Sequence, residues 1–318
     1  MPEHVIVGRG GALSLGAQGT HASAAASSID LPIISATVTR DVTWTPRPHL
    51  SAGTAGHRRY RVKTRERYPV KTVQELMYTG LGLLLRAALG DAATTGSGPY
   101  THTFTLAATL PMLTAIVHDG TPSGGSISAY KSTVDSCVVS SLRLTGREGD
   151  IVRCEADMVG RLEARATTTP PTVAMPNPVI AHQGSTLAWN STTPKIHDFD
   201  LVLDNGLEGE RRAIGSLYVS RPIVGAHRVA RLTVTMDVTD DAEVTALRAG
   251  TQGDAVLTFT GTSQSMTITL HNAQIVEEGT PVDTFGSLKR RVVFEAAADG
   301  TDQGLSIVIV NAESSALA

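Results

Sequence analysis

The strongest constraint on the fold is that this 318-residue chain repeats itself. Thr103-Phe104-Thr105 leads into an apolar segment at 112–118, and Thr258-Phe259-Thr260 leads into a similar segment at 266–271. A helical pattern comes before each motif and ends at a glycine, Gly90 in the first half and Gly250 in the second. The motifs are 155 positions apart (103 to 258) and the glycines 160 (90 to 250). Because two independent features share nearly one offset, the sequence predicts two related halves.

A proline-rich stretch separates the halves. Residues 164–194 contain two adjacent prolines at 170 and 171 and further prolines at 176, 178 and 194, which is typical of a loop. We therefore expect a first domain over 33–165, a linker over 166–194 and a second domain over 195–318. Residues 1–32 are rich in glycine, alanine and serine, and we expect them to form an N-terminal arm with little core of its own.

Composition and periodicity favour strands over helix bundles. Hydrophobic residues make up 41% of the chain but aromatic residues only 4%, so small and β-branched residues carry most of the apolar content. Apolar and charged residues alternate over 152–158 after a turn at 146–150, which predicts a half-buried antiparallel hairpin. We expect Cys154 to lie near Ser141 in that hairpin, too far from Cys137 for a disulfide.

Two helices are expected among the strands. The first begins at Thr72, with Glu75 three residues later as in a capping box, and ends at Gly90. The second is shorter, begins at Asp240 and ends at Gly250.

Charge and hydropathy exclude some classes of partner. No apolar run approaches the roughly 20 residues that a membrane helix needs, and the N-terminus lacks the pattern of a cleaved signal peptide, so we expect no membrane partner. The net charge of -3 hides an asymmetry: residues 1–165 carry 17 Lys and Arg against 13 Asp and Glu, and residues 166–318 carry 10 against 17. A basic stretch can bind nucleic acid, but the acidic second half of another subunit is the better match here.

Short motifs in a fixed order resemble the phage tail tube protein family, in particular the siphophage-type major tail protein with two tandem tail tube domains. The similarity covers nearly the whole chain from about Ile33. The segments that carry it are Tyr100–Thr105 after the helix ending at Gly90, Val134–Ser136, Leu142–Ile151, Phe199–Leu207, Leu232–Met236 and Val308–Asn311.

This resemblance implies a mainly β fold of two tandem curved β-sandwich or barrel tail tube domains, each with one flanking α-helix. It implies a structural virion protein, not an enzyme, that polymerises into stacked rings forming the hollow tail tube through which DNA is ejected. Because each chain would supply two of six ring positions, we expect a homotrimer per pseudo-hexameric ring; six chains per ring with one decorating domain is the alternative.

The resemblance also implies further partners and a location. Tape measure, tail terminator and baseplate or tip proteins are expected partners beside the chain itself, and DNA is expected to pass without specific binding. The expected location is the virion tail, assembled in the host cytoplasm.

The basic segment from Arg47 to Lys71 is the predicted contact between rings, because aromatic residues interleave with its arginines as they do in interface anchors. The alternative is a solvated loop. The candidate residues are Trp44, Arg47, Arg58, Arg59, Tyr60, Arg61, Lys63, Arg65, Arg67 and Tyr68.

The lumen of such a tube is expected to be neutral or acidic, because fixed cations would bind phosphate and slow the passage of DNA. Strand faces rich in threonine and acidic residues supply this surface. The candidates for it are Glu155, Asp157, Asp237 and Glu295, and the alternative for each is a solvated charge on the outside.

Motifs for catalysis and ligand binding are incomplete. Ser128 and Lys131 have the Ser-x-x-Lys spacing of some acyl enzymes without the partner motifs, and His197 on a strand shares no face with Asp198 or Asp200. We expect no catalytic residue, no cofactor and no metal. A β-rich carbohydrate- or receptor-binding tail module is the alternative function, and a contractile-tail or secretion-system tube is the alternative setting.

Overall fold

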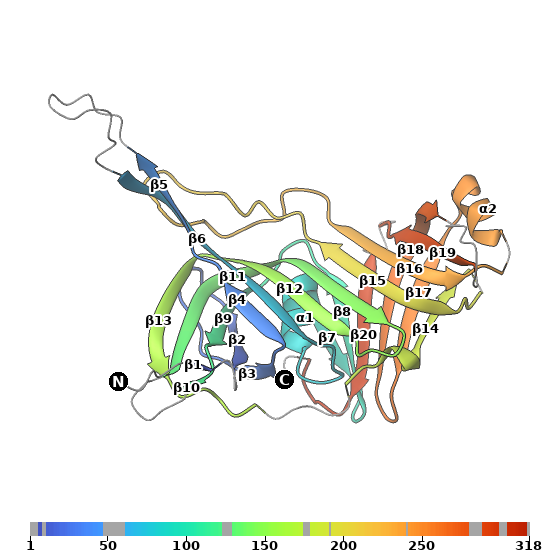
Figure 1. Ribbon diagram of the computed structural model, residues 1–318, viewed down its shortest axis with the longest axis horizontal. Coiled ribbons are helices and arrows are strands. Elements are labelled where there is room, and N and C mark those ends of the chain that lie inside the picture. Colours follow the sequence, from blue (N-terminus) through green and yellow to red (C-terminus); the bar gives the residue numbers. More distant parts are fainter. Residues whose placement is uncertain are drawn as a thin grey trace.

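The computed structural model describes residues 6–7, 11–46, 61–122, 129–173, 179–190, 192–239, 241–279, 288–298 and 304–316. The fold of these residues is mainly β, with two short α-helices (Figure 1). The strands of the two halves lie side by side, and one long hairpin projects from the first half (Figure 1).

The first half contains fourteen elements in the described residues. They are β1 (Ile6–Val7), β2 (Ala12–Gln18), β3 (Ile29–Pro32), β4 (Ser35–Val38), β5 (Asp41–Pro46), β6 (Arg61–Glu75), α1 (Gly82–Leu89), β7 (Gly90–Thr95), β8 (Tyr100–Leu106), β9 (Met112–His118), β10 (Thr121–Pro122), β11 (Ala129–Arg147), β12 (Arg153–Gly160) and β13 (Leu162–Thr168).

The described residues of the second half form a short 3-10 helix, one α-helix and seven strands. They are η1 (His182–Gly184), β14 (Ser185–Trp189), β15 (Ile196–Asp204), β16 (Val229–Asp237), α2 (Ala242–Ala249), β17 (Gln252–Thr260), β18 (Ser265–Gly279), β19 (Lys289–Glu295) and β20 (Leu305–Asn311).

Three antiparallel sheets share two bent strands. The long sheet has the order β4-β6-β12-β11-β15-β16-β19-β18 and therefore runs through both halves. The first short sheet is β3-β2-β9-β11-β13, and the second is β14-β17-β18-β20-β8-β7. β11 and β18 give their N-terminal parts to a short sheet and their C-terminal parts to the long sheet. One buried apolar cluster contains residues of all three sheets.

The two bent strands are built alike. β11 bends at Ser136 (φ 53°) and β18 at Asn272 (φ 49°), both in the left-handed region that few residues other than glycine adopt. Each strand also has two bulges. One lies beside the bend, where β11 pairs with β9 and β18 pairs with β17. The other lies just after the bend, where β11 pairs with β12 and β18 pairs with β19. All three irregularities recur 136 positions later (136 to 272), so the structure contains a repeat, with an offset at the bends that differs from the 155 and 160 read from the sequence.

The equivalence extends to the neighbouring elements, with one exception. The pairing shows which elements correspond. β2 corresponds to β14, β4 to β15, β6 to β16, α1 to α2, β9 to β17, β12 to β19 and β13 to β20. β7 and β8 have no counterpart: they form a hairpin inserted after α1 that pairs with β20. The alignment of the Thr-Phe-Thr motifs in β8 and β17 is therefore wrong. The error arose because both strands have a buried phenylalanine, Phe104 or Phe259, between two threonines.

The first predicted helix is wrong at its start and correct at its end. β6 continues to Glu75 because β4 and β12 pair with it on both sides, and its residues alternate between buried and partly exposed. Tertiary pairing thus overrides the local capping pattern. α1 is shorter and ends at Gly90 (φ 120°), and α2 ends at Gly250 (φ 64°), both as predicted. Asp240 lies outside the described residues.

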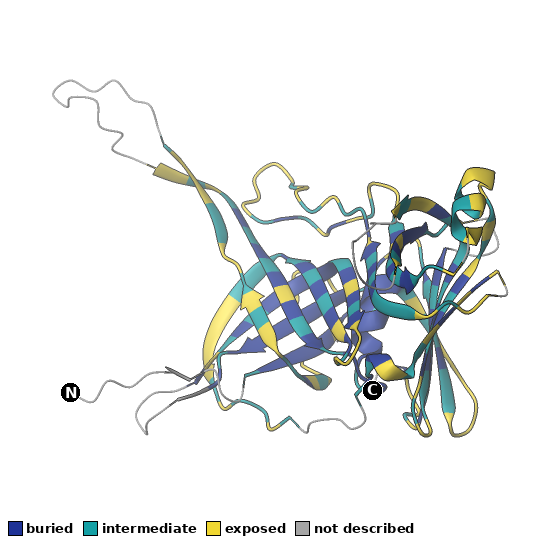
Figure 2. Cartoon of the chain, turned by 45° about the vertical axis from the view of Figure 1, so that its right-hand side comes forward, coloured by how far each residue is buried: buried dark blue, intermediate teal, exposed yellow. Residues whose placement is uncertain are grey.

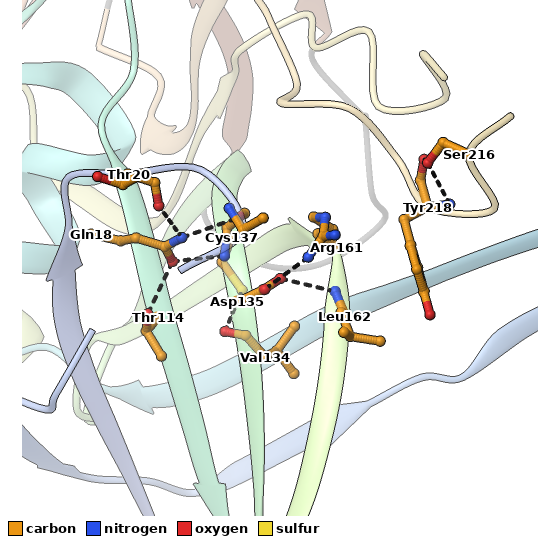
Figure 3. Close-up of polar contacts among 12 residues, drawn as sticks. Gln18, Thr20, Thr114, Val134, Asp135, Cys137, Arg161, Leu162, Ser216 and Tyr218 are labelled. Carbon is orange, nitrogen blue, oxygen red and sulfur yellow. Dashed lines mark hydrogen bonds and ion pairs between the residues drawn. The ribbon is translucent and has the colours of Figure 1, made fainter. Parts of the chain in front are cut away.

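The prediction of an N-terminal arm over 1–32 is wrong for its second part. β2 lies between β3 and β9, and its Leu13 and Leu15 are fully buried. The buried amide of Gln18, at the end of β2, accepts from the Thr114 hydroxyl (3.0 Å) and from the Ser136 N–H (2.8 Å) (Figure 3). Because Ser136 is the bend of β11, this network fixes the N-terminal strand at the point where β11 changes sheets.

Cys137 and Cys154 are free, as predicted, in a hairpin whose register differs from the expected one. Cys154 lies opposite Leu144 and not near Ser141. Burial raises the pKa of both thiols to about 12, so neither is a reactive thiolate near neutral pH.

Strand pairing ties the two halves together, and a half-buried arginine adds to it. The segment between β15 and β16, residues 205–228, which we call the strap, returns over the first half (Figure 1). Arg228 at its end donates to the carbonyl oxygens of Ala88 and Leu89 (both 3.0 Å) and of Ala107 (2.8 Å). It therefore caps the C-terminal end of α1. Burial lowers the pKa of Arg228 to about 10.

Replacing Arg228 by alanine is expected to lower the free energy of unfolding by roughly 3 kcal/mol, because buried carbonyl groups lose a charged donor. Urea unfolding of the purified chain measures the change. Arg231→Ala is the matched control: that side chain is 58% exposed in an ion pair with Glu295, so its loss is expected to stay below about 1 kcal/mol. Equal losses in the two variants would contradict the role of Arg228.

Candidate functional site

The long sheet presents one continuous polar face. Directly opposed residues of an antiparallel sheet point to the same side. The register joins Glu155, Arg143, Val202, Arg231 and Glu295 into one row across five strands. The intervening residues of these strands are buried in the core, and Figure 2 shows this alternation along the sheet.

The four residues predicted to line the lumen all lie on this face. Glu155 and Asp157 stand two positions apart on β12, and Glu295 belongs to the same row as Glu155. Asp237 stands six positions after Arg231 on β16, which places it on the same side. The register thus brings together acidic residues that the sequence offered as separate candidates.

Four cations on the polar face are paired with neighbouring carboxylates. Arg143 donates to both carboxylate oxygens of Asp200 (2.8 and 2.6 Å), across the β11–β15 junction between the halves. Three further pairs join adjacent strands: Lys71–Glu155 (3.3 Å), Arg231–Glu295 (2.7 Å) and Arg291–Glu277 (2.7 Å). Because these pairs are partly exposed, each adds little stability, but each reduces the positive charge that the face offers to a phosphate.

His197 lies at one end of this face and connects the two halves. A bulge in β15 beside Ile196 places its Nε2 atom 2.8 Å from Asp237 and its Nδ1 atom 3.0 Å from Glu148, in the β11–β12 turn. Hydrogen bonds with Asp237 and then with Glu148 raise the pKa of His197. The sequence had suggested this residue only as an unconvincing metal ligand.

Across the described ranges, no group of three His, Cys, Asp or Glu side chains is placed to hold a metal ion. Neither of the helices in those ranges has the length and apolar character needed to cross a membrane.

The predicted contact segment between rings forms the projecting hairpin of β5 and β6, which we call the arm (Figure 1). Trp44 is 53% exposed on it, and Arg61 is exposed at the point where the description of β6 begins. The other candidates before β6, which are Arg47, Arg58, Arg59 and Tyr60, lie outside the described residues.

The remaining candidates of the arm already have partners within the chain. The pairs are Lys63–Glu66, Arg65–Asp41, Arg65–Glu210, Arg67–Asp41 and Arg67–Glu210. Tyr68 is buried and its hydroxyl donates to Glu66. Its side chain is therefore part of the core, which leaves it little surface to offer a neighbouring subunit.

The strap lies along the arm, a contact that the sequence did not predict. The Glu66 N–H donates to the Leu217 carbonyl (3.0 Å), and the Arg161 guanidinium lies 5.0 Å from the ring centroid of Tyr218. Arg161 is held in turn by Asp135 (3.1 Å) (Figure 3). The sequence could not predict this contact, because the spacing of polar residues carries no information about the strand on which a loop will lie.

One comparison with known proteins identifies a family. The family model described as phage tail tube protein matches residues 10–315, which is nearly the whole chain. No curated protein matches the chain.

The His197 cluster is expected to make stability depend on pH. Since the folded-state pKa is raised above its usual value of about 6.5, the stabilisation is complete below about pH 6.5 and is lost as the pH rises through the folded pKa. The melting-temperature difference between the wild type and His197→Gln should therefore shrink between pH 5.5 and 8.5. In an Asp237→Asn background the same substitution should show a weaker pH dependence, and an unchanged dependence would contradict the assignment.

Proposed function

The chain belongs to the phage tail tube protein family and is a structural component of the viral tail, and from this premise we propose that its copies close into rings through the edges of the long sheet. The rings stack into the hollow tube through which DNA is ejected. Assembly takes place in the host cytoplasm.

The observation that carries this proposal is the junction between the halves. β11 of the first half pairs with β15 of the second. Their counterparts are β18 and β4, which stand at the two ends of the long sheet and have no further partner along it in the described part of the chain. The internal junction is therefore a template for a junction between copies, with β18 of one copy beside β4 of the next. A head-to-tail contact of this kind closes into a ring when the rotation allows it.

The repeat also supplies the register of the proposed junction. Bulges at the same place make Val139 equivalent to Ile275 and hence Arg143 equivalent to Gly279. Val202 is in the same way equivalent to Thr39. Val202 lies opposite Arg231 on β16, and Thr39 lies opposite Pro69, the equivalent residue on β6. Since Arg143 lies opposite Val202 inside the chain, Gly279 of one copy should lie opposite Thr39 of its neighbour.

The number of copies follows from the long sheet. Each half supplies four of its strands, β4-β6-β12-β11 from the first and β15-β16-β19-β18 from the second. Because both halves contribute equally, one chain fills two of six ring positions, and three chains complete a ring. Six chains per ring, with one half decorating the outside, is the arrangement that this argument disfavours.

The polar face of the long sheet is the proposed lining of the lumen, with Glu155, Asp157, Asp237 and Glu295 on it. The pairing of its cations with carboxylates supports this orientation, since DNA has to slide past without being bound. The arm, with Trp44 and Arg61 exposed, is the proposed contact between rings. Tape measure, tail terminator and baseplate or tip proteins are the proposed partners at the lumen and at the ends of the tube.

The proposed junction predicts a disulfide between copies. A Thr39→Cys/Gly279→Cys variant should cross-link under mild oxidation, because directly opposed residues have Cα atoms about 4.5–5.5 Å apart, within the range of a disulfide. The native thiols are buried and should not interfere, and a Cβ atom at Gly279 meets no other atom within 4 Å. The ladder on a denaturing gel should end at three chains.

A pair with the wrong register serves as the control. Thr37→Cys with Gly279→Cys places the thiols two residues out of register and should cross-link far less. A ladder ending at six chains would replace the trimer by the hexamer. Equal cross-linking of both pairs, or none in filaments seen by negative-stain microscopy, would refute the β18–β4 junction.

A further inference from the structure

We propose that the tip of the strap, residues 211–217, docks into a cleft at the opposite end of the long sheet of a second copy, in the adjacent ring. The inference rests on the proposed tube function and names a contact that the arm alone does not supply. Its parts are an exposed apolar anchor, a receiving cleft and a complementary charge.

The anchor is Ile214, whose side chain is fully exposed at the tip of the strap. It stands in a tight turn closed by a hydrogen bond from the Ser216 N–H to the Ala213 carbonyl (3.1 Å), with Gly215 at φ 87°. Leu217 beside it is also exposed. Two neighbouring exposed aliphatic side chains on a projecting turn are more typical of a contact surface than of a solvated loop.

The tip is held in place before any partner arrives. The Leu217 carbonyl accepts from the Glu66 N–H (3.0 Å), and the Ser216 hydroxyl bonds to the backbone of Tyr218 (Figure 3). Tyr218 lies against the Arg161 guanidinium, and the strap is anchored at its far end by Arg228. A contact surface that is already ordered loses less conformational entropy when it binds.

The receiving cleft lies at the other end of β15 and β16. It has a volume of about 470 Å³ and is continuous with a second hollow through Thr193, Pro194, Lys195 and Asp237. Pro194 and Ile196 are the apolar side chains of its lining, which also includes the carboxylates of Glu148 and Asp237 beside Lys195 and His197. A volume of this order is enough to receive a small cluster of side chains.

The positions of tip and cleft fit a stack of identical copies. β15 begins at the cleft with Ile196 and ends at Asp204, where the strap starts. Its nine residues span about 30 Å. The arm leaves the long sheet from the same end as the strap (Figure 1). A second copy displaced along the strands therefore brings its cleft toward this tip, and the contact repeats at every ring.

Charge is compatible with the same pairing. Arg211 is exposed in the tip, and the lining of the cleft includes Glu148 and Asp237, which also bond to His197, beside Lys195. The apolar anchor thus finds apolar side chains in the cleft, and Arg211 finds carboxylates. Other proteins are poorer occupants, because only a second copy offers the tip once for every cleft along the tube.

An aspartate at the anchor tests the contact. Ile214→Asp is expected to form rings as the wild type does but to lose the long filaments, because a charge would be buried against Pro194, Ile196 and the carboxylates of the cleft. Size-exclusion chromatography with light scattering measures the rings, and negative-stain microscopy measures filament length. Ile223→Asp is the matched control on the same strap, since Ile223 is 40% exposed away from the tip, and it should leave filaments intact.

A cysteine pair locates the contact directly. Ile214→Cys with Thr193→Cys should cross-link chains of adjacent rings, whereas Ile214→Cys with Ala166→Cys, on β13, should not. Filaments of normal length from Ile214→Asp, or equal cross-linking of both pairs, would overturn this inference and leave the ring proposal standing. A wild type that forms neither rings nor filaments would overturn the proposed function itself.

Discussion

The bends of β11 and β18 are the constraint on which the rest of the fold depends. Each strand can serve two sheets only because one residue, Ser136 or Asn272, takes a left-handed conformation that disfavours most side chains. In both places the N–H of the bend residue finds a carboxamide or carboxylate oxygen, from Gln18 (2.8 Å) or Asp254 (3.0 Å). A side-chain acceptor thus replaces the backbone partner that the bend takes away.

The bends produce a long sheet whose edge strands, β4 and β18, have no further partner along it among the described residues. The bend carries the C-terminal part of β11 to β15, and it carries the equivalent part of β18 to the end of the sheet, where the description shows β19 on one side. An exposed strand edge invites unspecific pairing. Glu277 and Glu278, which pair with Arg291 and Arg290, make β18 a charged edge, and charged edges discourage such pairing. The edge strand β4 carries the uncharged residues Ser35 and Thr37 and therefore remains a suitable partner for β18.

The sequence predicted features that depend on the local pattern of residues. It did not predict features that depend on pairing with distant strands. The glycine ends of both helices and the hairpin of β11 and β12 were correct, because Gly90 and Gly250 adopt positive φ values and the hairpin has a clear period of two. The start of α1 failed because Thr72 and Glu75 suit a capped helix locally, whereas pairing on both sides makes them part of a strand. The lumen candidates were chosen by charge alone, and only the register could show that they share a face.

The two halves differ in a pair of equivalent connections between strands. The connection from β4 to β6 forms the projecting arm, whereas the equivalent connection from β15 to β16 forms the strap, which folds back along that arm. Glu210 of the strap pairs with Arg65 and Arg67 of the arm, so each connection helps to hold the other. A ring of three chains would then carry three such composite projections on a sheet of sixfold appearance. In the proposed ring, the duplicated chain would give the stack a threefold pattern of contacts, which six identical domains could not provide.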